Sequence, residues 1–520
     1  MESVGLYTGF LMGSRGFVPL YRRLAGEISE AITTGRLPSG TRMLSLRDCA
    51  AQNQLSMNTV IAAYRLLEDQ GFIKSRPQSG FEVCIVLQEL DHPLEAHVTN
   101  ASADSESDMM TLLLEAHQRP SSVDLAFASP RGKRFFPSPA LANLTRTVLR
   151  NQQSLLASYV LPPGSKLLRD EIARRAVRLG MSLEPENICL THGTTEALQL
   201  ALRAVARPGD AIGIEAPSYF NLYPLLNSLG LRGIEIPTHP RTGFVMEHVE
   251  SLCADGSLAA IVCMPTVQNP LGYTMPIENK KRLAELAALH QLPIIEDSIY
   301  AELQFSEPLQ PALKSFDNEG WVLVCGGFSK TLAPDYRVGW LEGGRFAQAV
   351  KRLKFYSSAS ESMLLCETIG LFLKDGGYER HLKSLRRLYQ SQINTVRSLV
   401  LRHFPLGTRA TQPDGGFVLW IELPKSVDSI QLAQAALSND IVIMPGQLYS
   451  KGESFRNCLR LTCCQEIDER YIGAVAKLGD WRVVRSKGWK PNCIQLNVDL
   501  LNLYTVYGYS YCAQQCVHAL

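Results

Sequence analysis

Short apolar runs alternate with amphipathic helical segments from Val123 onward, and this alternation constrains the fold more than any other feature of the chain. A strand that is buried on both faces reads as a continuous apolar run, and successive parallel strands need a long connection, usually a helix. The pattern therefore predicts an α/β domain with a mainly parallel sheet covered by helices. The expected strands lie at residues 187–191, 211–215, 259–264, 292–296 and 321–326.

Polar residues stand where these expected strands end, at the edge where ligands of parallel sheets bind. Asp297 follows the fourth strand and Ser329-Lys330 the fifth, with Arg337 seven residues later (337 − 330 = 7). A Lys can form a Schiff base with the aldehyde of pyridoxal 5'-phosphate, and an Asp can pair with its protonated pyridine nitrogen. Ser329 and Arg337 can hold its phosphate. The pattern predicts a pyridoxal phosphate site with Lys330 as the catalytic residue, although Lys330 and Arg337 taken singly also fit ordinary surface positions.

Further motifs follow the other expected strands. The Gly-Thr-Thr segment at 193–195 opens a helix whose backbone N–H groups can cradle a phosphate, although a helix-capping motif reads almost the same. Tyr219 can stack on a planar ring or fill the core. Asn269 can donate a hydrogen bond to a ring hydroxyl or occupy a plain turn, and Tyr300 can bond the same ring oxygen. The predicted cofactor-binding residues are Gly193, Thr194, Thr195, Tyr219, Asn269, Asp297, Tyr300, Ser329, Lys330 and Arg337.

Taken together and in this order, these motifs resemble the fold-type-I pyridoxal phosphate enzymes, specifically the aspartate aminotransferase-like superfamily. The resemblance runs from about Val123 to about Leu478. It implies a large α/β domain with a mainly parallel sheet and a small α+β domain. It also implies that Arg460, in the segment Leu-Arg-Leu at 459–461, grips the α-carboxylate of an amino acid. Tyr159 would be supplied to the phosphate site of a neighbouring subunit, so a homodimer is expected.

The first part of the chain has a different pattern. Apolar residues at helical spacing predict a helix from Leu20 to Ile32, a second at 46–52 and a third that Ser56 caps. Two short strands are expected at 72–76 and 80–83, which completes the α+β layout of a winged helix-turn-helix. Cations that could neutralise DNA phosphates crowd this segment, although a solvated basic face fits the pattern equally well. They are Arg22, Arg23, Arg36, Arg42, Arg47, Lys74 and Arg76.

The sequence Pro-Ser-Gly-Thr-Arg-Met-Leu-Ser-Leu-Arg at 38–47, with Ser-Met-Asn-Thr-Val at 56–60, resembles the signature of the GntR family of bacterial repressors. The resemblance covers about Pro19 to Val83 and implies that this module binds double-stranded operator DNA. Met57 departs from relatives that carry Arg there, which leaves the base preference open. The DNA contacts implied by the resemblance are Arg47, Ser56, Asn58, Thr59 and Gly80.

A GntR-like module followed by an aminotransferase-like body resembles the MocR subfamily of bacterial regulators. We expect a DNA-binding domain at 19–85, a linker at 86–122, an aminotransferase-like domain at 123–480 and an atypical tail at 481–520. The linker is rich in Ser, Asp and Glu, which predicts a flexible tether. The resemblance implies a pyridoxal phosphate-dependent regulator that senses an amino acid, an amine or the cofactor itself. An active aminotransferase with an accessory DNA-binding domain is the alternative.

The composition limits compartment and partners. Hydrophobic residues make up 46% of the chain, charged residues 20%, and the net charge is only +2, so DNA binding has to rest on local charge. The 13 cysteines contain no C-x-x-C pair and no zinc-site spacing, so neither a disulfide framework nor a metal site is expected. The sequence shows no signal peptide and no membrane-spanning apolar run. A cytoplasmic protein, associated with the bacterial nucleoid when bound to DNA, is expected.

Overall fold

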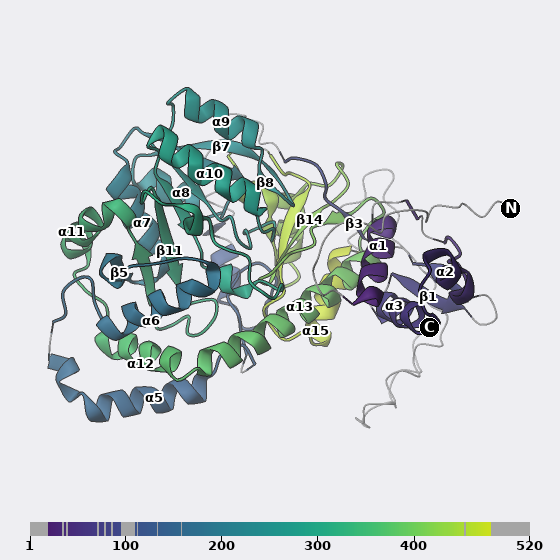
Figure 1. Ribbon diagram of the computed structural model, residues 1–520, viewed down its shortest axis with the longest axis horizontal. Helices are drawn as coiled ribbons and strands as arrows, with labels where there is room; N and C mark the ends of the chain where they lie inside the picture. Colours follow the sequence, from purple (N-terminus) through teal and green to yellow (C-terminus); the bar gives the residue numbers. More distant parts are fainter. Residues whose placement is uncertain are drawn as a thin grey trace.

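The computed structural model describes residues 19–479, apart from residues 34–35, 38–39, 70–71, 77–79, 85–86, 95–109, 112, 133, 158 and 452–453. The predicted tail at 481–520 and the segment before residue 19 lie outside the described residues. Figure 1 shows an N-terminal module at one end of the molecule and a larger body built around a sheet. Within the described part of the chain, no helix is both long and apolar enough to cross a membrane.

Three helices and a two-stranded antiparallel hairpin form the N-terminal module, as the sequence predicts. Ser45 and Ser56 accept backbone hydrogen bonds from Asp48 N (3.1 Å) and Thr59 N (3.2 Å), which explains where the second and third helices begin. Apolar side chains of all five elements pack into a core of their own. The elements are α1 (Leu20–Thr33), α2 (Leu46–Asn53), α3 (Met57–Asp69), β1 (Ile73–Arg76) and β2 (Gly80–Val83).

An eight-stranded sheet forms the large domain, in the order β5-β12-β11-β10-β9-β6-β7-β8. The five predicted strands are all present and correspond to β5, β6, β9, β10 and β11. Pairing is parallel from β7 through β6, β9 and β10 to β11, whereas β12 is antiparallel to both of its neighbours. The strands are β5 (Ile188–Thr191), β6 (Ala211–Ala216), β7 (Arg232–His239), β8 (Gly243–Phe244), β9 (Ala260–Cys263), β10 (Ile294–Asp297), β11 (Val322–Gly327) and β12 (Gly339–Glu342).

Helices cover both faces of this sheet (Figure 1). Successive strand residues point to opposite faces, so Ile294 and Ile295 of β10 belong to two different hydrophobic clusters. One cluster includes side chains of α7 (Gly193–Val205), α8 (Leu222–Ser228) and α11 (Ala347–Ser357). The other includes side chains of α6 (Lys166–Ala176), α9 (Met246–Ala254), α10 (Ile277–His290) and α12 (Met363–Lys374).

A second, five-stranded sheet in the order β16-β17-β14-β13-β3 forms the small domain. The long helix α13 (Gly377–His403) and the terminal helix α15 (Glu469–Gly479) contribute buried side chains to the same cluster as this sheet. Helix α5 (Ser138–Asn151) packs against α12 in the large domain. The remaining strands and α-helix are β16 (Met444–Pro445), β17 (Cys458–Thr462), β14 (Val418–Glu422), β13 (Arg409–Ala410), β3 (Gln88–Glu89), α14 (Ser429–Leu437), β4 (Val123–Asp124) and β15 (Ile441–Val442).

The described parts of the predicted linker differ from the expected flexible tether. Residues 88–89 form β3, which pairs with β13, and residues 113–117 are helical. Leu87, Leu90, Leu94 and Leu113 are buried in the main hydrophobic cluster. Polar residues surround these leucines in the sequence, so composition alone obscures the buried positions. The most polar stretch, residues 95–109, lies outside the described residues.

Candidate functional site

A cavity of about 290 Å³ lies at the carboxyl ends of the parallel strands, where the sequence places the cofactor motifs. Its volume is near the lower end of the range typical of small-molecule sites. Most of the predicted cofactor-binding residues line it, and they come from the segments that follow five different strands. The predicted residues in its wall are Thr194, Thr195, Tyr219, Asn269, Asp297, Tyr300, Ser329, Lys330 and Arg337.

The first turn of α7 forms one end of the cavity, together with Arg337. Gly193 has a φ of +77°, and a Cβ there would lie 2.7 Å from Arg337 Nη2, so the guanidinium packs directly on the glycine backbone. Arg337 Nη1 donates a hydrogen bond to Ser329 Oγ (3.3 Å). Thr194 Oγ1 is buried and has no hydrogen-bond partner among the described residues. A buried donor without a partner is costly, and helix N-termini favour anions, so this end of the cavity fits a phosphate.

The capping alternative for this segment is only partly realised. Glu196 accepts a hydrogen bond from the backbone N–H of His192 at 2.6 Å, as a capping carboxylate does. The hydroxyl of Thr194 does not take part, because it is buried against Gly327 and has no hydrogen-bond partner among the described residues. The helix start therefore has a carboxylate cap of its own, and the Thr194 hydroxyl is not used by it.

Asp297 and Lys330 face the same cavity with opposite pKa shifts. Asp297, at the end of β10, is buried and accepts a hydrogen bond from Ile299 N (3.0 Å). Burial raises the pKa of its carboxyl to about 7. Burial lowers the pKa of the Lys330 ammonium to about 8, and its Nζ donates a hydrogen bond to the backbone oxygen of Ala128 (2.6 Å). Both shifts favour the neutral forms, because charge is expensive in a low dielectric.

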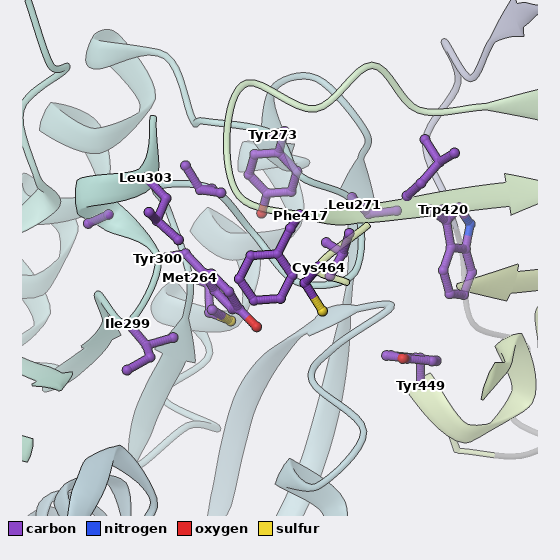
Figure 2. Close-up of a cluster of buried hydrophobic side chains, with 14 of the residues drawn as sticks. Met264, Leu271, Tyr273, Ile299, Tyr300, Leu303, Phe417, Trp420, Tyr449 and Cys464 are labelled. Atoms are coloured by element: carbon purple, nitrogen blue, oxygen red, sulfur yellow. The ribbon is translucent and has the colours of Figure 1, made fainter. Parts of the chain in front are cut away.

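Three further side chains form the cavity wall between the α7 end and the pair Asp297 and Lys330. Tyr219 lies in the segment that follows β6, and burial raises the pKa of its hydroxyl. Asn269 is buried, and its Oδ1 accepts a hydrogen bond from Arg460 Nη1 (3.2 Å), which leaves its NH₂ group to donate. Tyr300 is buried with its ring 5.4 Å from that of Phe417. Figure 2 shows the rings of Tyr300 and Phe417 next to each other.

Arg460, on β17, is fully buried behind the cavity wall. Besides the bond to Asn269, its Nη2 donates to the backbone oxygen of Ala126, and its guanidinium lies 5.4 Å from the Tyr449 ring centre. Its Nε has no hydrogen-bond partner within the described chain. Arg460 is therefore held next to the cavity by groups that a carboxylate can replace.

Tyr159 lies apart from the cavity of its own chain. Its side chain is 93% exposed, and it stands beside Leu156 and Leu161, which are 69% and 60% exposed. Such a run of exposed large side chains is unusual on a monomeric surface. The structure thus brings every predicted site residue of the body to one region except Tyr159.

Sequence reasoning missed the loop after β4. Phe127, Ala128 and Ser129 line the cavity, and the backbone oxygen of Ala128 is the partner of Lys330. These residues carry no titratable group, and a backbone carbonyl has no signature in the sequence. The position of this loop directly after a short strand was the one available signal.

Glu215, at the end of β6, was also missed. Its carboxylate accepts hydrogen bonds from Met264 N (3.2 Å), Gln268 Nε2 (3.4 Å) and Tyr273 Oη (2.5 Å). Burial raises the pKa of this carboxyl to about 7. These bonds order the loop that carries Asn269. A Glu that ends an apolar predicted strand was the signal that could have identified it.

The predicted DNA contacts lie on one module. Arg47 and Asn58 are exposed, and Gly80 has a φ of +82° with open space around its Cα. Ser56 and Thr59 are partly engaged, because their hydroxyls bond each other at 2.8 Å. Some cations there form no salt bridge with any described residue, which leaves them available for phosphates. They are Arg22, Arg42, Arg47 and Lys74.

The comparisons with known proteins agree with both halves. Residues 123–477 match the family "Aminotransferase class I and II", and residues 20–83 match "Bacterial regulatory proteins, gntR family". The uncharacterized HTH-type transcriptional regulators YjiR and YdcR of Escherichia coli are 32% and 34% identical, each over 88% of this chain and 98% of theirs. Pyrococcus horikoshii kynurenine aminotransferase, solved with PMP, has a TM-score of 0.67 and 25% identity, covering 73% of this chain and 96% of that one.

These matches extend over nearly all of the described residues and in the same order as the fold. The larger match contains the cavity, and the smaller one ends with the wing. The family of the larger match depends on pyridoxal phosphate, and the cavity chemistry fits that cofactor. The chain therefore belongs to the aminotransferase class I and II family and, with its N-terminal GntR-type helix-turn-helix domain, to the MocR-type regulators.

Proposed function

We propose that the chain is a transcription regulator that senses an amino acid, an amine or pyridoxal phosphate itself through its aminotransferase-like domain. The observation that carries the proposal is the convergence of Asp297, Lys330 and Arg337 on one cavity of a chain that also has a DNA-binding module. When bound, pyridoxal phosphate supplies an aldehyde that bonds covalently to amines and a ring that withdraws electrons.

The cavity residues divide into three roles toward this cofactor. The start of α7, with Ser329 and Arg337, would hold the phosphate, since it combines backbone donors with a guanidinium. Asp297 would pair with the ring nitrogen, which supplies the positive charge that its buried carboxyl lacks. Lys330 would hold the aldehyde. Its pKa near 8 leaves more neutral, nucleophilic amine at neutral pH than an ordinary lysine has.

The effector would enter between the cofactor and Arg460. Its carboxylate would replace the backbone oxygen of Ala126 as a partner of that guanidinium, and its amine would lie next to Lys330. The described cavity wall has no cation other than Lys330 and Arg337, and six of its other fourteen residues are apolar. An amino acid with an apolar side chain therefore fits better than a dicarboxylic one. The apolar wall residues are Phe127, Ala128, Leu198, Phe220, Met264 and Ile299.

A spectral titration tests this proposal. Pyridoxal phosphate should produce a visible absorbance band in the purified protein, and borohydride reduction followed by peptide mapping should label Lys330. L-Phenylalanine should shift the band at lower concentration than L-aspartate does, and it should change the affinity for DNA. Lys330→Ala should lose the covalent label. If Lys330 stays unlabelled in cofactor-saturated protein, the cofactor assignment is wrong.

The alternative function is an active aminotransferase with an accessory DNA-binding domain. The cavity supports it as well, because Lys330 stands where an acid/base group has to move a proton between an amino acid and the cofactor. Sustained turnover of an amino acid and a keto acid distinguishes the two. A sensor should bind the amino acid and release no stoichiometric product.

We also propose a homodimer. The exposed Tyr159, Leu156 and Leu161 are the supporting observation, because a second copy would bury them. In this arrangement the Tyr159 hydroxyl of one subunit would reach the phosphate site of the other. Mass measurement in solution should give twice 57.6 kDa. The proposal places this dimer in the bacterial cytoplasm, where its DNA partner is.

A further inference from the structure

Residues 87–94, which we call the strap, cross from the sheet of the small domain to the sheet of the large domain. β3 is the edge strand of the small-domain sheet, with Gln88 opposite Arg409 and Glu89 opposite Ala410 of β13. Five residues later (94 − 89 = 5), Leu94 pairs with Thr238 of β7 in the large-domain sheet. The two backbone hydrogen bonds of that bridge measure 2.9 and 3.1 Å. The strap is therefore hydrogen-bonded to both domains.

Buried leucine side chains also attach the strap to the body. Leu87, Leu90 and Leu94 are only 5%, 2% and 6% exposed, and all three belong to the hydrophobic cluster that both domains share. Removing buried leucines from such a cluster is costly. The strap is thus part of the body and does not act as a loose connection.

The charges on the strap face opposite charges on the large domain. Glu89, whose side chain is 11% exposed, forms an ion pair with Arg241, which follows β7. Asp91 lies 3.8 Å from Arg241 Nη1 and 3.6 Å from His239 Nε2. The Glu89 backbone pairs with the small domain while its carboxylate pairs with the large one. Glu89 therefore contacts both domains, so its interactions depend on how the two domains are placed relative to each other.

The anchors of the strap are close to the cavity wall. Thr238, the partner of Leu94, also accepts a hydrogen bond through Oγ1 from Ala216 N (3.1 Å), and Ala216 ends the strand that precedes Tyr219. In the small domain, Asp414 accepts a hydrogen bond from Thr274 N (2.7 Å), in the loop that carries Asn269. Thr238 therefore connects Leu94 of the strap to the strand that precedes Tyr219.

The other end of the strap leads directly to the wing of the DNA-binding module. Cys84 N donates to Phe72 O at 2.9 Å, so residue 84 still belongs to the wing. Three peptide units separate it from Leu87 (87 − 84 = 3), and together they span at most about 11 Å. The wing therefore cannot move independently of the strap over larger distances.

We propose that the strap transmits the relative position of the two domains to the DNA-binding module. This inference rests on the proposed function, because the signal is a ligand in the cavity. A ligand shifts the balance between two domain arrangements only by its differential affinity for them. The strap is bonded to both domains and continues into the wing, so each arrangement presents the wing differently to DNA.

Arg241→Gln tests the strap in the full-length protein, with Arg282→Gln as the matched control. Arg282 is also a half-exposed arginine with two carboxylate partners, Glu250 (2.7 Å) and Glu285 (3.4 Å), but it lies on α10 away from the strap. The probes are pyridoxal phosphate, L-phenylalanine and a DNA duplex selected by the wild-type protein from a random library. The readouts are the visible spectrum and the DNA affinity with and without the small molecules.

Wild type and Arg282→Gln should show the same ligand-dependent change in DNA affinity. Arg241→Gln should keep the spectral response and the ligand-free affinity within about threefold, yet lose most of that change. Arg241→Lys keeps the cation and should restore it. An insertion of about six Gly and Ser residues between Cys84 and Leu87 should also abolish the response, because a flexible linker does not transmit position.

The possible results distinguish a failure of the strap proposal from a failure of the proposed function. Full ligand responses in both Arg241→Gln and the insertion variant would overturn the strap and leave sensing intact. A wild-type protein with the spectral band but no ligand-dependent DNA affinity would overturn sensing and the strap together, while cofactor binding would stand. A lost response in both variants, with an unchanged spectrum, supports the strap.

Discussion

At the scale of single residues, one physical cause shapes the site. Burial raises the pKa of Asp297 to about 7 and lowers that of Lys330 to about 8, so both groups are pushed toward neutrality in the free protein. A cofactor with a cationic ring nitrogen and an aldehyde relieves both, since one charge is paired and one amine is bonded. Asp297 and Lys330 therefore lower the stability of the cofactor-free protein, and a bound cofactor removes this cost.

Asp297→Asn should stabilise the cofactor-free protein at pH 8 and weaken its binding of pyridoxal phosphate. The folded-state pKa of about 7 lies above the ordinary value of 3.8, so the folded state holds the extra proton between these pH values. The free energy of unfolding that depends on this carboxyl is therefore highest below about pH 4, and it falls as the pH rises toward 7. A shift of this size corresponds to about 4 kcal/mol as an upper limit.

Thermal unfolding of both cofactor-free proteins from pH 8 down to pH 5 measures this effect. The gap between the variant and the wild type should narrow steadily as the pH falls. A variant that melts below the wild type at pH 8 would mean that the carboxylate is satisfied without the cofactor.

The chemistry of individual residues decided which of them the sequence could identify. Asp297 and Lys330 stand out because a charged group after an apolar strand needs a partner. Phe127 and Ala128 contribute an apolar face and a backbone oxygen, which any loop residue can supply. Charged and polar wall residues that follow strands were therefore predictable, whereas the apolar side chains and the backbone oxygen of the loop after β4 were not.

At the scale of elements, strands buried on both faces were predictable and strands that need a partner to exist were not. β10 and β11 read as apolar runs because both of their faces are covered. β3 has two residues with polar side chains and exists through its pairing with β13. The spacing of Leu87, Leu90 and Leu94 (i, i+3, i+7) is that of a helix and not the alternation of a strand. Local sequence therefore could not reveal the strap.

Gly193→Ala should weaken pyridoxal phosphate binding at least tenfold, which is about 1.4 kcal/mol. A Cβ at this position would lie 2.7 Å from Arg337 Nη2 and would require an alanine at a φ of +77°. The matched control is Gly473→Ala in α15, where nothing lies within 4 Å of the new Cβ. The control should stabilise the protein by about 0.5–1 kcal/mol and leave binding unchanged. Titration of the visible band and thermal unfolding check both, and equal affinities would argue against a phosphate at α7.

Two neighbouring residues at the start of α3 should separate stability from DNA recognition. Ser56→Ala removes the oxygen that accepts from Thr59 N and should cost about 1 kcal/mol of module stability. Asn58→Ala changes an exposed side chain, so it should leave the melting curve unchanged while weakening DNA binding by about 1–3 kcal/mol. Calorimetry and DNA titration at fixed salt measure the two effects. Normal DNA affinity in Asn58→Ala would remove this residue from the interface.

At the scale of the whole molecule, the fold joins two sites that share no residues. The cavity lies at the carboxyl ends of the large-domain strands, with Arg460 of the small domain bonded to its wall through Asn269, and the DNA-binding module continues into a segment that both domains hold. A regulator needs such a connection, whereas a catalyst with an appended module does not. The attachment of the strap to both sheets therefore favours regulation over the alternative of an accessory DNA-binding domain.

Subunit mixing tests the proposed dimer at the same scale. Lys330→Ala removes the bond to the cofactor, and Tyr159→Ala removes a side chain that is 93% exposed on its own subunit. If Tyr159 serves the partner's phosphate site, each variant alone should bind pyridoxal phosphate poorly. A mixed dimer contains one site with both an intact Lys330 and an intact Tyr159, so an equal mixture should regain about a quarter of the wild-type sites. Borohydride labelling of Lys330 counts them. No recovery on mixing, with dimers shown to exchange, would place Tyr159 outside the site and leave the exposed patch without this role.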